Sequence, residues 1–321
     1  MSIPESIHFI PLLSVHPNKV VCYSEPTRPM NRVVKNAALN FLGAEAAKAK
    51  EQNLSLEEQK ELVSEIDNFQ KGELSKNAKR KLFRAIDYLL FLAPEKTSYH
   101  FKTKKPFKWK VNFITMTLPA KQFHTDNEIK KKCLDPFLLE LKRYHEMRNY
   151  IWRAERQKNG NIHFHILADQ YIHYSILRNR WNRITERLGY ITKFEQKNKH
   201  RTPNSTDVHS LSRVKNVRAY VAKYVSKAEK GNPIKGRIWG CSQNLSNIKG
   251  AQDVIDYGIA EEIKQLAKSK EVKPFYEKYF SVFSFESSFL FKNQFPRLQA
   301  LFDSYLNTQF NYSRQSSALY N

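Results

Sequence analysis

Alternating apolar and polar residues predict β-strands in the middle of the chain. Residues 107–118, FKWKVNFITMTL, alternate in this way and are rich in β-branched and aromatic residues, as is typical of a strand. Residues 151–167, IWRAERQKNGNIHFHIL, predict a β-hairpin. Its turn falls at Asn159-Gly160, because glycine tolerates the positive φ that hairpin turns require.

Helical spacing of apolar residues separates these strands. Residues 135–147 and 174–188 each place their apolar residues on one helix face, and residues 216–230 predict a third helix. Two shorter strands are expected at residues 207–212 and 236–242. This order of elements predicts an α+β fold on an antiparallel sheet, in the split β-α-β-β-α-β layout of ferredoxin-like and RRM-like domains.

The two ends of the chain have different patterns. Residues 1–43 contain five prolines and predict loops, with one short strand near residues 19–24. Residues 44–93 predict helices, residues 251–266 predict another, and the aromatic-rich residues 273–291 fit neither pattern clearly. These changes divide the chain into an irregular then helical N-terminal segment, a central domain and a C-terminal extension, at residues 1–95, 96–245 and 246–321.

The excess of basic residues indicates a polyanionic partner. Lys and Arg number 54 against 31 Asp and Glu, which gives a net charge of +23. Nucleic acid is favoured over a membrane surface, because no strongly amphipathic basic helix carries Trp and Phe on one face. The 13% of aromatic residues offer stacking platforms for unpaired bases.

Hydropathy and cysteine use favour a reducing, aqueous compartment. No run of about 18 apolar residues is present, and residues 1–13 lack the basic and apolar regions of a signal peptide. The three cysteines, Cys22, Cys133 and Cys241, are far apart, which argues against a zinc knuckle. We therefore expect a cytoplasmic protein with no membrane partner.

Two histidines on the predicted hairpin indicate a metal site. His163 and His165 are two apart on a strand, so their side chains point to the same face. A divalent ion needs at least one more ligand. A two-residue loop would pair Arg156 with His163, whereas the three-residue loop 158–160 pairs Glu155 with His163. We favour the second register, because it brings a carboxylate to both imidazoles.

Two tyrosines share one face of the predicted helix at residues 216–230. Tyr220 and Tyr224 are four apart, and Lys223 and Lys227 each follow a tyrosine at the third position. Tyrosine becomes a useful nucleophile where a nearby cation or metal stabilises its phenolate. Attack by a phenolate on a phosphodiester yields a phosphotyrosine and conserves the bond energy. A metal on the hairpin would bind the non-bridging phosphate oxygens.

Three segments, taken together, resemble the HUH endonuclease superfamily. VNFITMTLP at residues 111–119 is similar to its first motif, ERQKNGNIHFHIL at 155–167 to its metal motif, and AYVAKYVSK at 219–227 to its nucleophile motif. GRIWGCSQNL at 236–245 is similar to a sequence that follows the nucleophile in phage proteins of this type. The two-tyrosine spacing resembles that of rolling-circle replication initiators from microvirus-type single-stranded DNA phages and their plasmid relatives.

The resemblance implies a metal-dependent, site-specific DNA endonuclease and strand transferase. One tyrosine would nick single-stranded origin DNA, keep the 5′ end, and free a 3′-OH for a host polymerase. The second would cut the regenerated origin, and the ends would be joined into a circle. Single-tyrosine relatives keep the position of Tyr224, so Tyr224 is the expected first nucleophile and Tyr220 its partner. Lys223, then Lys227, are the candidate cations near the phosphates, and the metal would be Mg²⁺ or Mn²⁺.

The same resemblance sets the expected partners and leaves alternatives open. No P-loop motif is present, so no fused helicase is expected and a host helicase or an already single-stranded origin is implied. If a phage encodes the chain, the location is the cytoplasm of its bacterial host. The alternatives are a mobilisation relaxase or a single-strand transposase with the same chemistry, and a non-catalytic basic DNA-binding protein. A relaxase of this family usually has a third histidine where Glu155 would serve here.

Overall fold

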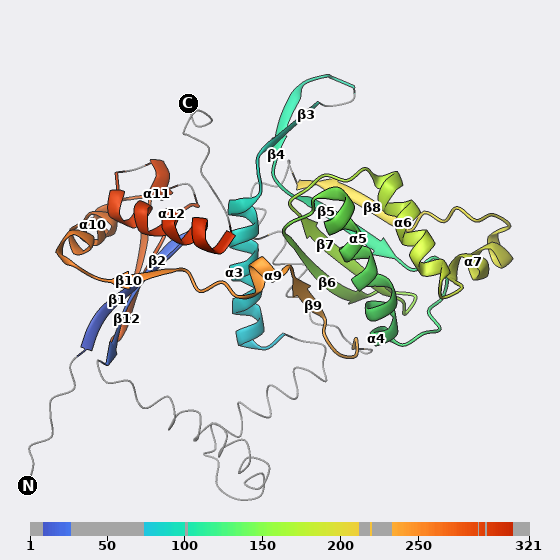
Figure 1. The fold of residues 1–321 in the computed structure, drawn as a ribbon, viewed down its shortest axis with the longest axis horizontal. Helices are drawn as coiled ribbons and strands as arrows, with labels where there is room; N and C mark the ends of the chain where they lie inside the picture. Colours follow the sequence, from blue (N-terminus) through green and yellow to red (C-terminus); the bar gives the residue numbers. More distant parts are fainter. Residues whose placement is uncertain are drawn as a thin grey trace, which may run out of the picture. The chain divides into compact units, whose positions relative to one another are not determined.

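The chain forms an α+β structure with antiparallel sheets, in agreement with the predicted class (Figure 1). The computed structural model describes residues 9–26, 74–99, 102–211, 219, 233–287, 289–292 and 294–310. The chain divides into two compact units, each described below by itself. The central unit comprises residues 63–248, and the terminal unit comprises residues 1–62 and 249–321. In the described parts, no helix is both long enough and apolar enough to span a bilayer.

The central unit contains an antiparallel sheet with the strand order β8-β5-β7-β6-β9. The pattern of alternating residues gives each strand two different faces. Phe164 of β7 is fully buried and contacts Trp181 at a ring-centroid distance of 6.1 Å, so the histidines on either side of it point to the opposite face. The strands are β5 Asn112–Thr117, β6 Tyr150–Arg156, β7 Ile162–Ala168, β8 Thr206–Ser210 and β9 Trp239–Cys241.

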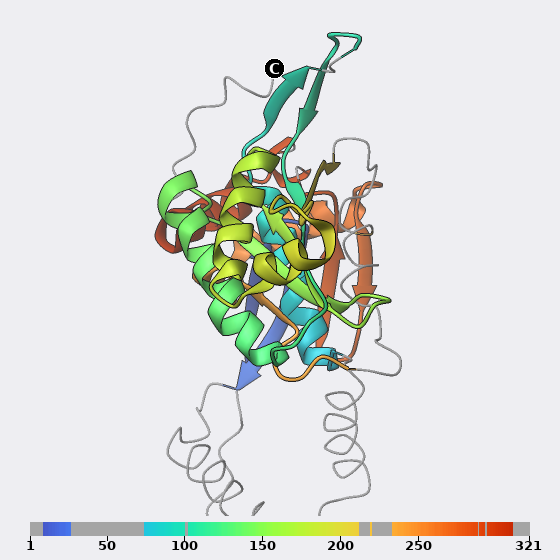
Figure 2. The same ribbon diagram turned by 90° about the vertical axis from the view of Figure 1, so that its right-hand side faces the viewer.

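Two helices pack on the face of this sheet that carries Phe164 (Figures 1 and 2). They are α5, Asp135–His145, and α6, Tyr174–Glu186. Trp181 of α6 packs against Phe137 of α5 at 5.3 Å and donates a hydrogen bond from Nε1 to the carbonyl of Thr117 at 2.6 Å. The other helices of the unit are α3 Lys76–Leu92, α4 Asp126–Ile129, the π-helix η1 Lys130–Leu134, α7 Tyr190–Asn198 and α9 Gln243–Ser246.

The single strand predicted at residues 107–118 is wrong, because the structure has two strands there. β4, Pro106–Trp109, pairs with β3, Lys96–Tyr99, in a separate hairpin, and β5 begins at Asn112. The carbonyl of Lys110 accepts a hydrogen bond from Lys96 Nζ at 3.4 Å instead of a strand partner. The apolar alternation continues through this break, so the sequence pattern hides it. Figure 2 shows the β3–β4 hairpin projecting from the sheet.

The terminal unit is built on a second antiparallel sheet, with the order β10-β1-β2-β12-β11. The prediction of loops at residues 1–43 is therefore wrong for residues 9–26, which form two full strands. Leu13, Val15 and Val20 are fully buried there, against partners from the far end of the chain. The strands are β1 Phe9–His16, β2 Lys19–Pro26, β10 Ala251–Val254, β11 Lys273–Tyr276 and β12 Phe280–Ser284.

The C-terminal part of the terminal unit also differs from the sequence pattern. The helix predicted at residues 251–266 is a strand, β10, followed by a helix that starts at Tyr257. The ambiguous residues 273–284 form the β11–β12 hairpin. The predicted helix at 216–230 lies outside the described residues, apart from residue 219. The helices of the unit are α10 Tyr257–Lys268, α11 Phe289–Lys292 and α12 Pro296–Phe310.

Two neighbouring leucines on α5 test the packing of the helical layer. Leu138 is 4% exposed, whereas Leu139 is 61% exposed. We expect Leu138→Ala to lower the free energy of unfolding by about 2–5 kcal/mol, because it leaves a cavity between α5 and the sheet. Leu139→Ala should change it by less than about 0.5 kcal/mol. Urea denaturation of both variants measures the difference, and equal losses would contradict the described packing.

Candidate metal centre

The β6–β7 hairpin has the register that the sequence predicted with a three-residue loop. Glu155 lies directly opposite His163, and Arg156 lies opposite Ile162. The Gln157 amide donates to the Asn161 carbonyl at 2.8 Å, which closes the loop 158–160. Gly160 has a φ of +85°, a left-handed conformation that a residue with a side chain rarely adopts. The glycine in the turn therefore fixes which residues face each other on the two strands.

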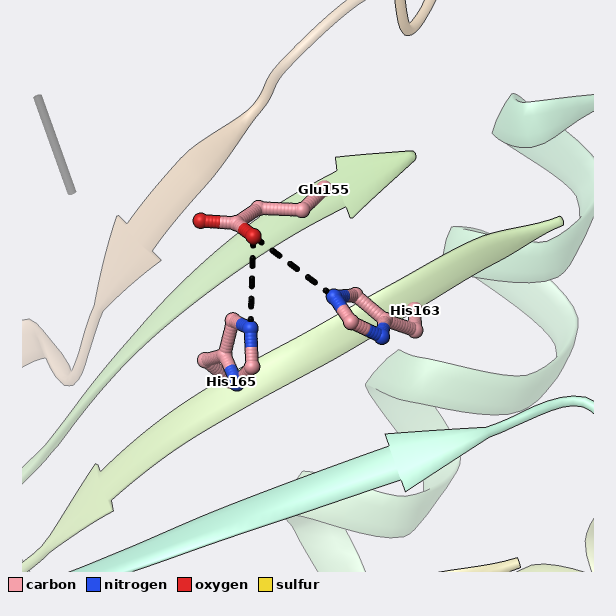
Figure 3. A group of neighbouring side chains, drawn as sticks. All are labelled: Glu155, His163 and His165. Atoms are coloured by element: carbon pink, nitrogen blue, oxygen red, sulfur yellow. Dashed lines mark ion pairs between the residues drawn. The ribbon is translucent and has the colours of Figure 1, made fainter. Parts of the chain in front are cut away.

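Glu155, His163 and His165 converge on one point (Figure 3). The Oε2 atom of Glu155 lies 3.4 Å from Nε2 of His165 and 3.6 Å from Nε2 of His163. One donor atom from each residue lies within 4.8 Å of the other two. The three side chains are largely buried, with exposed fractions of 11–15%. One carboxylate and two imidazoles form a donor set that suits a divalent cation.

The electrostatics of the triad fit a bound cation. Burial would raise the pKa of the Glu155 carboxyl, but the two imidazoles beside it outweigh burial and lower that pKa to about 2. The second carboxylate oxygen, Oε1, and both ring nitrogens of His163 are buried without a hydrogen-bond partner among the described residues. Buried polar atoms normally have partners, so these atoms are available as metal ligands.

Neighbouring side chains hold His165 in place. Nδ1 of His165 lies 3.1 Å from Oγ1 of Thr115, which stands opposite it on β5. The ring of Phe113 packs beside the imidazole at a centroid distance of 5.0 Å. A hydrogen bond at Nδ1 fixes the ring orientation and makes Nε2 the nitrogen that can bind a metal. Thr115 thus orients a ligand from the next strand.

Arg153 is a residue of this face that the sequence did not single out. It lies directly opposite His165 and, two positions before Glu155, on the same face of β6. The residue is 2% exposed, and its Nη1 donates to the carbonyl of Ile238 at 3.4 Å. The hairpin register contains the signal, because the same alternation that places Glu155 beside the histidines places Arg153 there too.

The remaining predicted site residues lie outside the described part of the chain. These are the two tyrosines and two lysines of the predicted helix: Tyr220, Tyr224, Lys223 and Lys227. The structure thus brings together Glu155, His163 and His165, and the prediction that their face meets the tyrosines remains a prediction.

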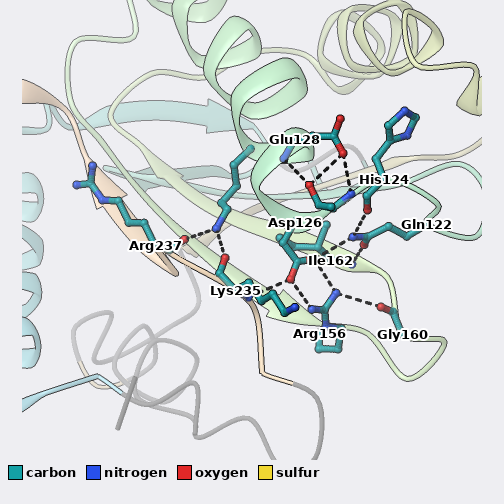
Figure 4. A network of polar contacts seen from close by, with 11 residues as sticks. Gln122, His124, Asp126, Glu128, Arg156, Gly160, Ile162, Lys235 and Arg237 are labelled. Carbon is teal, nitrogen blue, oxygen red and sulfur yellow. Dashed lines mark hydrogen bonds and ion pairs between the residues drawn. The ribbon is translucent and has the colours of Figure 1, made fainter. Parts of the chain in front are cut away.

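A buried ion pair fixes the base of the hairpin (Figure 4). Asp126, 7% exposed, accepts two hydrogen bonds from Arg156, at 2.9 and 2.6 Å, and one from the backbone of Lys235 at 3.0 Å. Gln122 donates to the same carboxylate at 2.8 Å and accepts from the Ile162 amide at 2.7 Å. Burial opposes the ionised carboxylate, but these bonds prevail and lower the pKa of Asp126. The network holds both strands of the hairpin next to the triad.

Lys130 extends this network toward β9. Its Nζ donates to the carbonyls of Lys235 and Arg237, at 2.6 and 3.0 Å. Burial lowers the pKa of Lys130, while the charge of Asp126 raises it again in part. The segment that follows the predicted tyrosine helix is therefore anchored to the same cluster that anchors the metal hairpin (Figure 4).

One protein family matches this part of the chain. The family model, described as a replication-associated protein of the ORF2 type, matches residues 111–229, which is less than half of the 321 residues. The match covers β5 to β8, all three residues of the triad and both predicted tyrosines. None of the curated proteins matches the chain. The match supports a role in replication for the central unit.

Loss of the carboxylate should abolish metal binding. We expect Glu155→Gln to weaken Mn²⁺ affinity by at least about 100-fold, because loss of a ligand costs more than loss of the residues that orient ligands. Isothermal titration calorimetry measures the affinity. Thr115→Val should have a smaller effect, about 10-fold, because it only removes the bond that orients the His165 ring. His200→Ala, an exposed histidine outside the triad, is the control. Unchanged Mn²⁺ binding by Glu155→Gln would exclude this site.

The Asp126–Arg156 pair should make stability depend on pH. We expect Asp126→Asn to lower the free energy of unfolding at pH 7 by about 3 kcal/mol, because it leaves a buried arginine poorly paired. The pKa of Asp126 is lowered in the folded state. Its contribution is thus complete above the ordinary carboxyl pKa of about 4 and is lost as the pH falls through the lower folded value.

Urea denaturation between pH 2 and pH 8 measures this effect. The gap between wild type and Asp126→Asn should be constant above about pH 5 and narrow in acid. Asp207→Asn is the matched control, because Asp207 is 62% exposed and its partner is the exposed His209. A gap of the same size at every pH would show that the carboxylate charge is not the stabilising feature.

Proposed function

We propose that the chain is a rolling-circle replication initiator of the HUH type that cuts and rejoins single-stranded origin DNA. The observation that carries the proposal is the Glu155–His163–His165 cluster, which lies inside the segment that matches a family of replication-associated proteins. The two-tyrosine motif falls in the same segment. Residues 96–245 are the proposed nuclease domain.

The strand order of the central unit supports this assignment. Numbered along the chain without β9, the order β8-β5-β7-β6 is 4-1-3-2, as a split β-α-β-β-α-β layout requires. Helices α5 and α6 cover one face, and the triad lies on the other. A helix after β8 that packs on this second face would bring tyrosines to the metal, which is the placement that we propose for residues 216–230.

Each group of the centre has a proposed task. Mg²⁺ or Mn²⁺, held by Glu155, His163 and His165, would supply positive charge to the non-bridging oxygens of the scissile phosphate. Thr115 orients His165. The phenolate oxygen of Tyr224 attacks the phosphorus, and the bond from phosphorus to the 3′ oxygen breaks. The 3′ oxygen leaves as a hydroxyl after taking a proton, and the 5′ phosphate stays on the tyrosine. Lys223 and then Lys227 are the proposed cations near the phosphates.

The second tyrosine completes the cycle. A host polymerase extends the free 3′-OH, and a host helicase opens the duplex where the origin is not already single-stranded. Tyr220 then attacks the regenerated origin, and the new 3′-OH attacks the first phosphotyrosine. That transfer forms a phosphodiester, releases Tyr224 and closes the circle. The reaction needs no ATP, because the phosphotyrosine bond conserves the energy of the broken linkage. The bacterial cytoplasm is the proposed location.

A covalent adduct on a denaturing gel tests the chemistry. The wild-type protein with Mn²⁺ and labelled single-stranded DNA of its cognate origin should form a protein–DNA adduct. Tyr220→Phe with Tyr224→Phe should form none, because the nucleophilic oxygens are gone. His163→Ala should slow adduct formation by at least about 100-fold, since positive charge at the phosphate is lost.

DNA binding is the control for folding and for the rival function. His163→Ala should still bind DNA with a strong dependence on salt, because Lys and Arg contact phosphates independently of the metal. An adduct formed by the double tyrosine variant would exclude these nucleophiles. Binding by the wild-type protein without any adduct on its cognate origin would favour a non-catalytic DNA-binding protein.

A further inference from the structure

A cavity of about 770 Å³ opens at the edge of the central-unit sheet, separate from the triad. Its walls come from the β3–β4 hairpin, the start of α6 and the edge strand β8. Pockets that take small organic molecules measure about 300–1,000 Å³. The cavity is therefore large enough for a planar ring system such as a nucleobase. Neither the metal centre nor the predicted tyrosine helix accounts for it.

Exposed aromatic rings dominate the walls of this cavity. Tyr99, Tyr171 and Tyr174 are 68%, 52% and 47% exposed, and all three line it. Tyr171 also packs edge-on against Trp109 at a centroid distance of 5.9 Å. The guanidinium of Arg178 lies 5.1 Å from the centroid of the Tyr174 ring. Aromatic rings together with an arginine form the kind of platform on which unpaired bases stack.

The polar groups of the cavity suit the edge of a base. Thr206 is 6% exposed, and its hydroxyl has no hydrogen-bond partner in the described parts of the chain. The same holds for Nε of Arg178, whose Nη2 donates to Asn204 at 2.6 Å. The cavity also has a carboxylate, Asp207, which disfavours a phosphate group there. A donor and a hydroxyl between aromatic rings match a base better than a backbone phosphate.

The cavity lies close to the triad through one intervening strand. Asp207 of β8 stands opposite Thr115 of β5, and Thr115 stands opposite His165 of β7 and contacts it. Neighbouring strands are about 4.8 Å apart, so β8 and β7 are separated by about 10 Å. Such a distance corresponds to a few nucleotides of a single strand. A strand bound at the triad can therefore reach the cavity with a neighbouring base.

We propose that this cavity holds unpaired bases of the single-stranded DNA next to the phosphate that the metal centre cleaves. The inference rests on the proposed function and adds a base-binding subsite to it. Tyr171 and Tyr174 supply the stacking surfaces, and Arg178 and Thr206 contact the base edge. The subsite accepts single strands only, because the bases of a duplex are stacked on each other and cannot enter.

Binding of a twelve-residue oligothymidylate in EDTA tests the subsite without any cleavage. We expect Tyr171→Ala with Tyr174→Ala to weaken binding by about tenfold or more, since each lost base stack costs about 1–3 kcal/mol. Binding to duplex DNA of the same length should not change. Tyr144→Ala is the matched control, because Tyr144 is also exposed, also lies under an arginine, Arg180 at 5.2 Å, and does not line the cavity.

The outcomes separate this subsite from the proposed function. If the double variant binds oligothymidylate as Tyr144→Ala does, or loses duplex binding equally, the subsite is excluded even where nicking is normal. If the double variant loses single-strand binding and the wild-type protein never forms an adduct, the subsite stands and the nuclease proposal fails. Where both hold, the double variant should raise the KM for nicking of origin DNA by about tenfold and leave kcat unchanged, because the residues bind the strand and do not touch the phosphate.

Discussion

The pairing of β6 with β7 is the constraint on which the rest of the centre depends. Side chains alternate between the two faces of a strand, so a slip of one residue would send Glu155 toward α5 and α6 and leave the histidines without a carboxylate. Gly160, at a positive φ, and the closing bond from Gln157 to Asn161 hold the pairing at one end. The donor set thus follows from the geometry of the turn.

A second constraint acts at the same end of the hairpin. Arg156 follows Glu155 directly and therefore points the other way, into its buried pair with Asp126. The same carboxylate and Lys130 hold the backbone of residues 235–237. One polar cluster consequently fixes the strand that supplies the carboxylate ligand and the strand that follows the predicted tyrosine helix. A replacement at Asp126 would disturb the centre without touching any ligand.

The sequence predicted the parts of the structure that depend on neighbouring residues. The hairpin, its register and the triad follow from alternation and from a glycine in the turn, all within residues 151–167. The break between β4 and β5 was missed, because Trp109, Val111 and Phe113 continue one apolar alternation across it. The strands at residues 9–26 were missed for a different reason. Their partners β10 and β12 come from the other end of the chain, and no local pattern reports such a pairing.

This last pairing has a consequence for how the protein is made. β1 and β2 leave the ribosome early, but β10 and β12, which flank them, follow only after Pro26 is separated from Ala251 by the whole central unit. At about 5–20 residues per second, that interval lasts about 10–50 s. A two-stranded ribbon is only marginally stable alone, so the first strands made remain unfinished until nearly the last are made. The central unit, whose strands follow one another closely, can fold first, and the terminal unit then joins the two ends of the nascent chain.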